Sequence, residues 1–485
     1  MKKFYITTPI YYINDVPHIG HTYTTLAADV LARYHREIGD ETFFLTGTDE
    51  HGAKIETKAK EMQMEPEQYA DKIATIFKNA WKELNISNDN FLRTTDEKHI
   101  KAVQKALQYM YDKGDIYLSK YEGLYCRGCE QYKSERDLVD GLCPDHKVAP
   151  EKMSEECYSF KLSKYQDELL EKIKKDELQI LPANRKNEMI SFYEKEGLSD
   201  VSFSRKNVNW GIPIPWDKSH TVYVWADAFL NYLTGLGWDG ATPFNKGGEG
   251  DLKFWPPSAQ LMSKDILRVH TTIWPAMLLS LDLPLPEKIF IHGFFQINGQ
   301  KMSKSLGNVI APADLIKKYG VDATRYLIMS ATAFGHDGDI SWEKFDEKYN
   351  ADLANGLGNL TARVSNLIEK NNLEIKLKIN SDKKLTEVYQ ASMQAFKFDE
   401  ALKILWDALR KCDEILSDKK PWKMEGLPDG EAGKKEIKNI LEPIAQDILN
   451  VADLLKPFMP NVSEKIIKQF SAKQIKKGEA LFPRI

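Results

Sequence analysis

Two lysines in the second half of the chain stand three positions apart in a short polar string. Lys301 and Lys304 belong to the sequence KMSKS at 301–305, which follows the turn-like residues Asn-Gly-Gln at 298–300. Two ammonium groups at this spacing are good counter-charges for a polyphosphate. A lysine–serine string this short is by itself more often a solvated surface loop. A second anion-binding signal elsewhere in the chain is therefore needed to support a function.

The string HIGH at residues 18–21 supplies that second signal. It follows an apolar run at 4–6 and precedes apolar residues at helical spacing. The N-terminus of a helix offers unpaired N–H groups and a positive dipole end to a phosphate. Gly20 lets a nucleotide approach closely because it has no side chain, and His18 and His21 share one helical face. The sequence predicts a phosphate site at a strand-to-helix junction.

The elements around HIGH predict how this site is built. Phe4–Thr8 is apolar and β-prone, apolar residues recur at helical spacing over 26–34, and Thr42–Leu45 is a second strand. This βαβ opening predicts a parallel sheet. The string TGTDEHG at 46–52 lies just past the second strand, where ligands collect in open α/β sheets.

Four potential metal ligands form two short pairs. Cys126-x2-Cys129 and Cys143-x2-His146 have the spacing of two knuckles that close a tetrahedral Cys₃His site. All four positions are filled by protein, so the pattern predicts one structural zinc ion rather than a catalytic one. Five cysteines in a long chain are too few, and odd in number, for a disulfide scaffold.

Composition limits the number of domains, the class of protein and the partners to be expected. A chain of 485 residues should hold about three domains, and 42% hydrophobic with 28% charged residues is ordinary for a soluble globular protein. We see no membrane-length apolar run and no signal or transit segment, so the cytoplasm is the expected compartment and no membrane partner is expected. The net charge of −4 gives no hint of nucleic-acid binding, which must be argued from motifs.

HIGH early and KMSKS late resemble the paired signature of class I aminoacyl-tRNA synthetases. Further stretches narrow the resemblance to the methionyl-tRNA synthetase family, over essentially the whole chain. They are TPIYYIN at 8–14, LTGTDEHG at 45–52, YVWADA at 223–228, and KDILRVH at 264–270 leading to Trp-Pro at 274–275. Ser263 and Val269 depart from the family, which often has Gly and Phe there.

The resemblance implies an α/β fold class: a Rossmann-like parallel sheet split by a zinc-binding connective insertion and followed by an α-helical bundle. The expected parts are the first half of the Rossmann catalytic domain at 1–115, the connective insertion at 116–222, the second Rossmann half at 223–295, a KMSKS-loop linker domain at 296–349 and an anticodon-binding helical domain at 350–485.

The family's activity is methionine–tRNA ligation, with ATP and Mg²⁺, through an enzyme-held methionyl adenylate. The residues that the resemblance assigns to ATP binding are His18, Gly20, His21, Lys301, Ser303 and Lys304. His18, Gly20, His21 and the two lysines are also expected to be catalytic, with Arg205 as a further phosphate or carboxylate contact. The amino acid's own carboxylate attacks the α-phosphate, so positioning and charge stabilisation are the expected tasks of the protein.

The resemblance also implies a methionine pocket. Its expected residues are Pro9, Ile10, Tyr12, Asp49, Trp225, Ala228, Tyr232, Asp265, His270 and Trp274. Asp49 would hold the α-ammonium group, and His270 would hold the hydroxyl of Tyr232. Aromatic walls suit a polarizable thioether, which agrees with the implied substrate. Taken singly, each aromatic residue is more often ordinary core.

The helical part carries two strings that resemble the family's anticodon-reading strips. They supply Asn359, Arg363, Pro421 and Trp422. Single-stranded RNA loops are read by stacking bases on aromatic side chains and by hydrogen bonds to base edges. The implied partner is tRNA(Met). The chain ends soon after this part, without room for the dimerising barrel of some relatives, so a monomer is expected.

Two alternatives remain open at this point. A class I synthetase for leucine, isoleucine or valine would need a far longer editing insertion, and one for cysteine would need an open zinc site. A non-catalytic RNA-binding paralogue should have a broken HIGH or KMSKS string, whereas both strings are intact.

Overall fold

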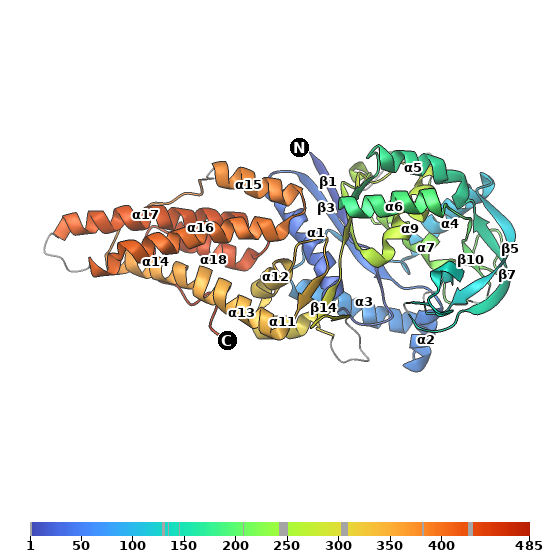
Figure 1. Ribbon diagram of the computed structural model, residues 1–485, viewed down its shortest axis with the longest axis horizontal. Coiled ribbons are helices and arrows are strands. Elements are labelled where there is room, and N and C mark those ends of the chain that lie inside the picture. Colours follow the sequence, from blue (N-terminus) through green and yellow to red (C-terminus); the bar gives the residue numbers. More distant parts are fainter. Residues whose placement is uncertain are drawn as a thin grey trace.

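The structure is a computed structural model that describes residues 2–128, 131–133, 135–144, 146–206, 208–241, 251–301, 309–380, 383–424 and 430–485. The molecule is elongated. An α/β part with the sheets occupies one end and a bundle of long helices extends from it, with the first strand near the middle of the long axis (Figure 1).

A parallel sheet forms the centre of the α/β part. Across it the strands are β2 (Tyr11–Tyr12), β3 (Glu41–Asp49), β1 (Lys3–Thr7), β12 (Ala259–Ser263), β13 (Lys288–His292) and β8 (Gln179–Leu181), with β4 (Asn90–Arg93) also paired to β3. Each of these pairings is parallel. The carboxyl ends of the strands therefore share one edge, which we call the catalytic edge. Strands β1 and β13 are buried almost throughout, as expected for parallel strands covered on both faces.

The predicted βαβ opening is confirmed. Helix α1 (Ile19–Glu37) connects β1 to β3, which pair in parallel from Lys3↔Glu41 to Thr7↔Leu45. The expected connective insertion covers all of 116–222, whereas β8 lies within that range and pairs with β13. A strand of three residues is too short to show a period in the sequence. Part of the insertion therefore returns to the central sheet.

The sheet is surrounded by helices (Figure 1). Besides α1 they are α2 (Ala53–Glu61), α3 (Pro66–Glu83), α4 (Glu97–Asp112), α5 (Gln166–Lys174), α6 (Ala183–Lys195), α7 (Val224–Ala228), α8 (Asn231–Thr234), α9 (Leu267–Thr271) and α10 (Ile273–Ser280). Helix α10 is apolar on all sides and almost wholly buried, as expected for a helix inside the core.

The insertion also builds small antiparallel sheets. One has the order β6 (Gln131–Lys133), β5 (Ile116–Cys126), β7 (Glu151–Phe160), β9 (Val201–Ser202), and the other pairs β10 (Ser204–Arg205) with β11 (Thr221–Val222). Strands β5 and β7 pair from Ile116↔Phe160 to Tyr125↔Glu151. Cys126 is the last residue of β5, so the first cysteine pair begins where this long ladder ends.

A linker follows the central sheet. Strand β14 (Phe295–Ile297) pairs with β15 (Gln300–Lys301) in a hairpin and with β16 (Gly338–Ile340). The linker helices are α11 (Pro312–Tyr319), α12 (Val321–Met329) and α13 (Trp342–Lys348). Asp339 in β16 accepts a hydrogen bond from the backbone N–H of Gly299 (2.7 Å), so the hairpin turn is tied down just before KMSKS.

The remainder of the described chain is helical, as the sequence predicts. It comprises a π-helical segment, η6 (Tyr349–Gly358), then α14 (Asn359–Lys370), α15 (Lys383–Gln394), α16 (Phe398–Lys419), α17 (Gly430–Leu455) and α18 (Pro460–Phe470). An apolar stripe of α16 is buried at Leu402, Leu405 and Leu409. These apolar faces pack on one another, which stabilises helices that are polar on their outer sides.

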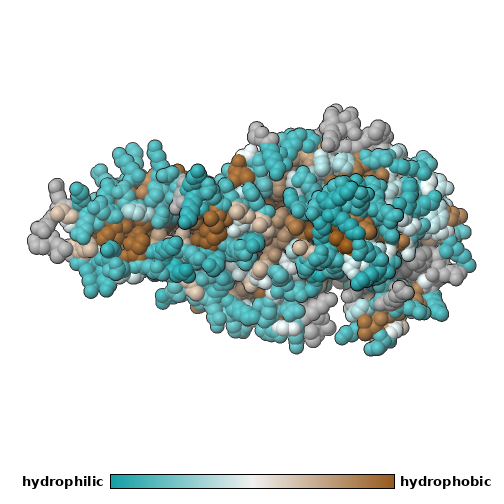
Figure 2. Space-filling model, turned by 45° about the horizontal axis from the view of Figure 1, so that its top comes forward, coloured by the Kyte–Doolittle hydropathy of each residue, from teal (hydrophilic) through white to brown (hydrophobic). Residues whose placement is uncertain are grey.

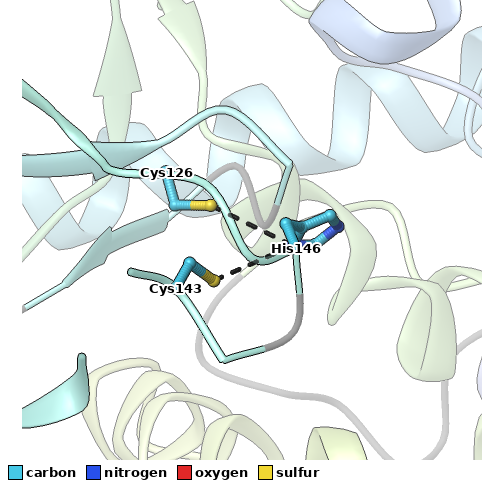
Figure 3. A group of neighbouring side chains, drawn as sticks. All are labelled: Cys126, Cys143 and His146. Atoms are coloured by element: carbon cyan, nitrogen blue, oxygen red, sulfur yellow. Dashed lines mark hydrogen bonds between the residues drawn. The ribbon is translucent and has the colours of Figure 1, made fainter. Parts of the chain in front are cut away.

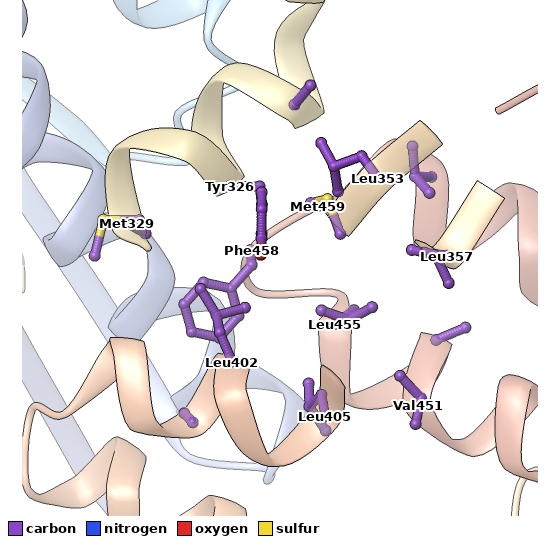
Figure 4. Close-up of a cluster of buried hydrophobic side chains, with 14 of the residues drawn as sticks. Tyr326, Met329, Leu353, Leu357, Leu402, Leu405, Val451, Leu455, Phe458 and Met459 are labelled. Atoms are coloured by element: carbon purple, nitrogen blue, oxygen red, sulfur yellow. The ribbon is translucent and has the colours of Figure 1, made fainter. Parts of the chain in front are cut away.

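The bundle and the α/β part meet in a continuous apolar core. Figure 4 shows side chains from α12, η6, α16, α17 and the α17–α18 connection pointing toward one another, among them Tyr326, Leu402 and Phe458. Beside this core, the buried Arg325 of α12 donates to Asp29 of α1 (2.7 Å) and to the carbonyl of Phe458 (2.8 Å). The helix that begins with HIGH is thus directly tied to the bundle.

The outer surface is mainly hydrophilic on the face shown in Figure 2, where brown patches are separated by teal ones. Among the described residues, no helix combines the length and the apolar character needed to cross a membrane.

Candidate active site

His18 caps the N-terminus of α1 at the catalytic edge. Its Nδ1 accepts a hydrogen bond from the backbone N–H of Gly20 (3.0 Å), and the backbone N–H of His18 donates to Nδ1 of His21 (3.2 Å). The two rings lie close, with centroids 3.9 Å apart. The histidines of HIGH therefore form a reciprocal cap, in which imidazoles take the places that Ser and Glu usually fill.

This cap fixes which ring nitrogen carries the proton. Burial lowers the pKa of His21 well below its usual range, and repulsion between two protonated rings at His18 and His21 would lower it further. A neutral imidazole has one N–H and one acceptor nitrogen. Since Nδ1 of each histidine accepts a backbone hydrogen bond, the proton of each neutral ring is on Nε2. The N-terminus of α1 thus presents ring donors as well as its dipole to an anion.

Two contacts hold this N-terminus against neighbouring elements. Thr24 of α1 hydrogen-bonds to Nε2 of His292 at the end of β13 (2.7 Å). The backbone N–H of Ile19 donates to the carbonyl oxygen of Ile310 (3.0 Å). Ile310 lies just beyond residues 302–308, so the structure brings a flank of KMSKS to HIGH although the two strings are far apart in sequence. Ser303 and Lys304 are outside the described residues, and only the backbone of Lys301 is described, in β15.

Residues predicted to line the methionine pocket follow β1 and β3. Pro9 and Ile10 are half-buried after β1, and Tyr12 of β2 is the partner of Asp49 at the end of β3. Asp49 is buried, with 7% of its surface exposed. Gly47 of β3 lets β4 approach closely, because a Cβ there would lie 2.1 Å from the carbonyl oxygen of Leu92. A carboxylate therefore stands beside the half-buried Pro9–Tyr12 segment at the catalytic edge.

The predicted aromatic residues form one cluster, and it includes one residue that the sequence did not single out. Phe229 stacks on Trp225 (ring centroids 5.3 Å apart) and on Trp274 (5.7 Å). Tyr232 lies against Trp274 (5.4 Å). Trp225 is only partly buried, whereas Trp274 is fully buried and donates to Gln260 of β12 (3.0 Å). The cluster offers one accessible aromatic wall backed by a rigid core.

His270 holds the hydroxyl of Tyr232, as the resemblance implies. Its Nδ1 hydrogen-bonds to the carbonyl of Ile266 (3.0 Å), so Nδ1 is the donor, and Nε2 accepts from the Tyr232 hydroxyl (2.9 Å). Burial lowers the pKa of His270 to about 4. The ring is therefore neutral at pH 7 and the orientation of the hydroxyl is fixed. This contact joins α8 and α9, so residue spacing alone does not predict it, whereas the family resemblance does.

Three predicted residues have different surroundings. Ala228 is buried on α7 beside Phe229. Asp265 is exposed and accepts a hydrogen bond from Ser263. Burial lowers the pKa of His292 and the charge of Asp265 opposes part of that shift, so Asp265 lies near the end of β13. Arg205 is 9% exposed, donates to Ser202 (2.8 Å), and its guanidinium lies 4.2 Å from the ring centroid of Tyr223, which precedes α7.

The cysteine–histidine pairs converge on one point (Figure 3). The ligand atoms of Cys126, Cys143 and His146 all lie within 4.8 Å of one another, with Nδ1 of His146 at 4.0 and 3.8 Å from the two sulfurs. A tetrahedral zinc ion with usual bond lengths needs roughly 3.6 Å between such atoms. Gly128 is required here, since a Cβ would lie 2.4 Å from the His146 ring. The described ligands fit a zinc ion, and Cys129 lies outside the described residues.

The residues predicted to contact RNA lie together on the helical bundle, which follows the central sheet in sequence. The guanidinium of Arg363 on α14 lies 5.4 Å from the ring centroid of Trp422 and donates to Asp413 (2.6 Å). Trp422 is 38% exposed and Asn359 is exposed one turn before Arg363, whereas Pro421 is buried. We call Asn359, Arg363, Pro421 and Trp422 the helical strip. It combines an open aromatic face with polar groups.

Known proteins resemble this chain over its whole length. The family model described as tRNA synthetases class I (M) matches residues 4–153 and 146–365. A methionine–tRNA ligase of Clostridium acetobutylicum is 43% identical over 100% of this chain and 78% of that protein, and one of Thermotoga maritima is 40% identical over 97% and 75%. The solved Mycobacterium tuberculosis methionyl-tRNA synthetase in complex with methionyl-adenylate has a TM-score of 0.90 and 34% identity, covering 100% of this chain and 99% of that one.

Proposed function

Because this chain belongs to the class I tRNA synthetases, among the methionine–tRNA ligases, we propose that its catalytic edge forms methionyl adenylate from methionine and ATP, and that the methionyl group then passes to the 3′ end of tRNA(Met). The observation that carries the proposal is the reciprocal cap at the start of α1. It presents two ring donors beside the flank of KMSKS at Ile310.

The proposed chemistry needs no nucleophile from the protein. The carboxylate of methionine attacks the α-phosphate and pyrophosphate leaves. Nε2–H of His18 and of His21 would donate to phosphate oxygens as charge develops there, which is where such donors lower a barrier most. Lys301 and Lys304, with Ser303, would hold the leaving pyrophosphate, and Arg205 would add a further positive charge. Mg²⁺, when bound with ATP, neutralises part of the phosphate charge.

Selection of methionine is proposed for the pocket between Asp49 and the aromatic cluster. Asp49 would bind the α-ammonium group, with Pro9, Ile10 and Tyr12 beside it. Trp225, Trp274 and Tyr232 would surround the thioether, which favours aromatic contacts. The Tyr232 hydroxyl has a single proton, which it gives to His270 in this structure and which a thioether sulfur could accept instead. A leucine side chain of similar size has no acceptor for it.

A structural zinc ion is proposed for Cys126, Cys129, Cys143 and His146. The convergence of the three described ligands and the tight fit around Gly128 support it. When bound, zinc would crosslink the ends of the β5–β7 ladder and contribute folding free energy. Metal analysis of the purified protein should find one zinc per chain, and a metal-free but fully active protein would refute the site.

Reading of the tRNA(Met) anticodon is proposed for the helical strip. Trp422 would stack on an unpaired base, and Asn359 and Arg363 would bond to base edges. Arg363 is now held by Asp413 and Trp422, so binding would exchange these contacts for contacts with RNA.

The overall proposal is tested by charging total tRNA with the purified protein, ATP, Mg²⁺ and a mixture of the standard amino acids. The expected product is methionyl-tRNA on tRNA(Met) alone. A matched reaction with Lys304→Ala should form it far more slowly, since loss of one charge-stabilising contact typically costs ~10²–10³-fold in rate. Charging with another amino acid, or none, would refute the proposal.

A further inference from the structure

A carboxylate that the proposed chemistry does not use is buried next to the methionine pocket. Asp227 has 1% of its surface exposed and receives hydrogen bonds from two histidines. Nδ1 of His51 lies 2.7 Å from one of its oxygens, and Nε2 of His99 lies 2.8 Å from the other. An ionised carboxylate only accepts hydrogen bonds, so both of these nitrogens are donors. Burial alone would raise the pKa of Asp227, but the two histidines hold it below its usual value.

The three side chains come from elements that carry different parts of the pocket. His51 stands two residues after Asp49, past the end of β3, and Asp227 is on α7 between Trp225 and Ala228. His99 is on α4, fully enclosed, and its Nδ1 hydrogen-bonds to Thr234 at the end of α8 (2.7 Å). The hydrogen bonds that Asp227 accepts therefore connect the proposed ammonium site with the proposed aromatic wall, and they hold both against α4.

Among the described residues, few other interactions fix the position of α7 and of Trp225. Helix α7 has only five residues, so its own hydrogen bonds cannot fix its orientation. Trp225 is partly exposed, and its ring contacts are with Phe229 and His270. The carboxylate of Asp227, two residues after Trp225, is thus a main constraint on where this wall stands relative to β3.

We propose that Asp227, held by His51 and His99, is a positioning residue for methionine activation, which sets the distance between the carboxylate that binds the α-ammonium group and the aromatic wall that binds the thioether. The proposal rests on the proposed function of the catalytic edge. Methionine must meet both groups at once, whereas ATP is bound by HIGH and KMSKS. Loosening Asp227 therefore weakens the binding of methionine and leaves that of ATP nearly unchanged.

A second buried carboxylate in the same part of the molecule provides a matched control. Asp115 is also 1% exposed and is held by three side chains, Lys164 (2.5 Å), Tyr165 (2.6 Å) and Ser280 (2.8 Å). Within the described parts of the chain, none of these three partners belongs to the proposed pocket. Asp115→Asn should lower stability through the same loss of charge, without moving either part of the methionine site.

The test uses the full-length protein and methionine-dependent ATP–pyrophosphate exchange without tRNA. Asp227→Asn keeps the shape but places an amide N–H₂ against a histidine donor. The loss of a hydrogen bond to a charged group costs substantial free energy. KM for methionine should therefore rise about tenfold or more, while KM for ATP stays within about twofold. Asp115→Asn should change neither KM, although its melting temperature falls.

A second pair of variants separates positioning from folding. His99→Gln retains a donor near the place of Nε2, whereas His99→Leu removes it. His99→Gln should keep KM for methionine near the wild-type value and His99→Leu should raise it as Asp227→Asn does. If Asp227→Asn does not fold, this pair of variants tests the positioning role in its place.

Unchanged KM for methionine in Asp227→Asn or His99→Leu, or equal rises in both KM values, would overturn the positioning role while leaving the proposed function intact. A wild-type protein that does not exchange with methionine would instead refute the proposed function itself, so the two failures are distinguishable.

Discussion

The catalytic edge and the helical strip present their polar groups in different ways. At the catalytic edge the polar groups are enclosed and their protons are assigned: His270 and His292 are buried, and Nδ1 of His18 and of His21 accepts from the backbone. In the helical strip Asn359 and Trp422 are exposed, and the partly exposed Arg363 contacts a partly exposed Asp413 and the Trp422 ring.

The difference follows from what each region is proposed to bind. A small amino acid and developing phosphate charge need donors that are already in place, because reorganising them during the reaction would cost free energy. An RNA loop brings its own flexibility and offers bases that splay out, so an open aromatic face is sufficient. Substitutions at the edge should therefore change chemistry, and those in the strip should change RNA affinity.

The largest effect is expected from His21→Ala. It removes a proposed phosphate donor and half of the reciprocal cap, so adenylate formation should slow ~10²–10³-fold, while affinity for tRNA stays unchanged. Single-turnover formation of methionyl adenylate measures the first quantity and filter binding of tRNA the second. A parallel loss of tRNA binding would show that the two regions are not independent.

The second effect is a pH dependence confined to the α/β part. All ten histidines lie before residue 337, so none is in the bundle. Burial lowers the pKa of His270 and of His292 to about 4, below the unfolded value, so the unfolded state binds more protons between these values. Stability is present above about pH 6.5 and falls as the pH drops toward 4, by about 2 kcal/mol per histidine between pH 7 and pH 5.

Urea unfolding at a series of pH values measures this slope. His292→Gln cannot titrate and should have a shallower slope than the wild type. Equal slopes in the two proteins would mean that burial does not keep His292 neutral.

The third effect is expected from Trp422→Ala, which removes the open aromatic face of the helical strip. Loss of one stacking face should weaken tRNA binding by roughly 1–3 kcal/mol and leave pyrophosphate exchange unchanged. Trp422→Phe keeps a ring and is the matched control. If exchange and charging fall together, Trp422 supports the fold; if neither falls, it is a surface tryptophan without a role in RNA binding.

The smallest effect is expected from Asp413→Asn. It releases Arg363 from a partly exposed ion pair, and such pairs contribute ~0–1 kcal/mol. The melting temperature should barely change, and tRNA affinity should stay equal or rise slightly, because Arg363 no longer has to leave a partner. A clear loss of tRNA binding would show that the ion pair holds Arg363 in its binding orientation.

Many elements of the fold could be predicted because the sequence carries strong local patterns at those elements. The apolar run of β1 and the HIGH string are each continuous in sequence, and the structure confirms the strand and the helix start that they predict. Strand β8 could not be predicted, since three residues carry no measurable period and the pairing partner is more than a hundred residues away.

The candidate site shows the same division between local patterns, which the sequence reveals, and tertiary contacts, which it does not. The strings at 18–21 and 301–305 predict a phosphate region, but the hydrogen bond between Ile19 and Ile310 depends on tertiary structure. Phe229 escaped notice because an isolated aromatic residue is usually core, and Asp227 because its partners, His51 and His99, come from two other elements.

The most direct test of the central claim is ATP–pyrophosphate exchange by the wild-type protein, without tRNA, for each of methionine, leucine, isoleucine, valine and cysteine. The catalytic edge described above predicts exchange with methionine at a rate at least about a hundredfold above the others, in line with a site built to bond a specific polar atom. Comparable exchange with any of the other four amino acids, or exchange that requires tRNA, would contradict it.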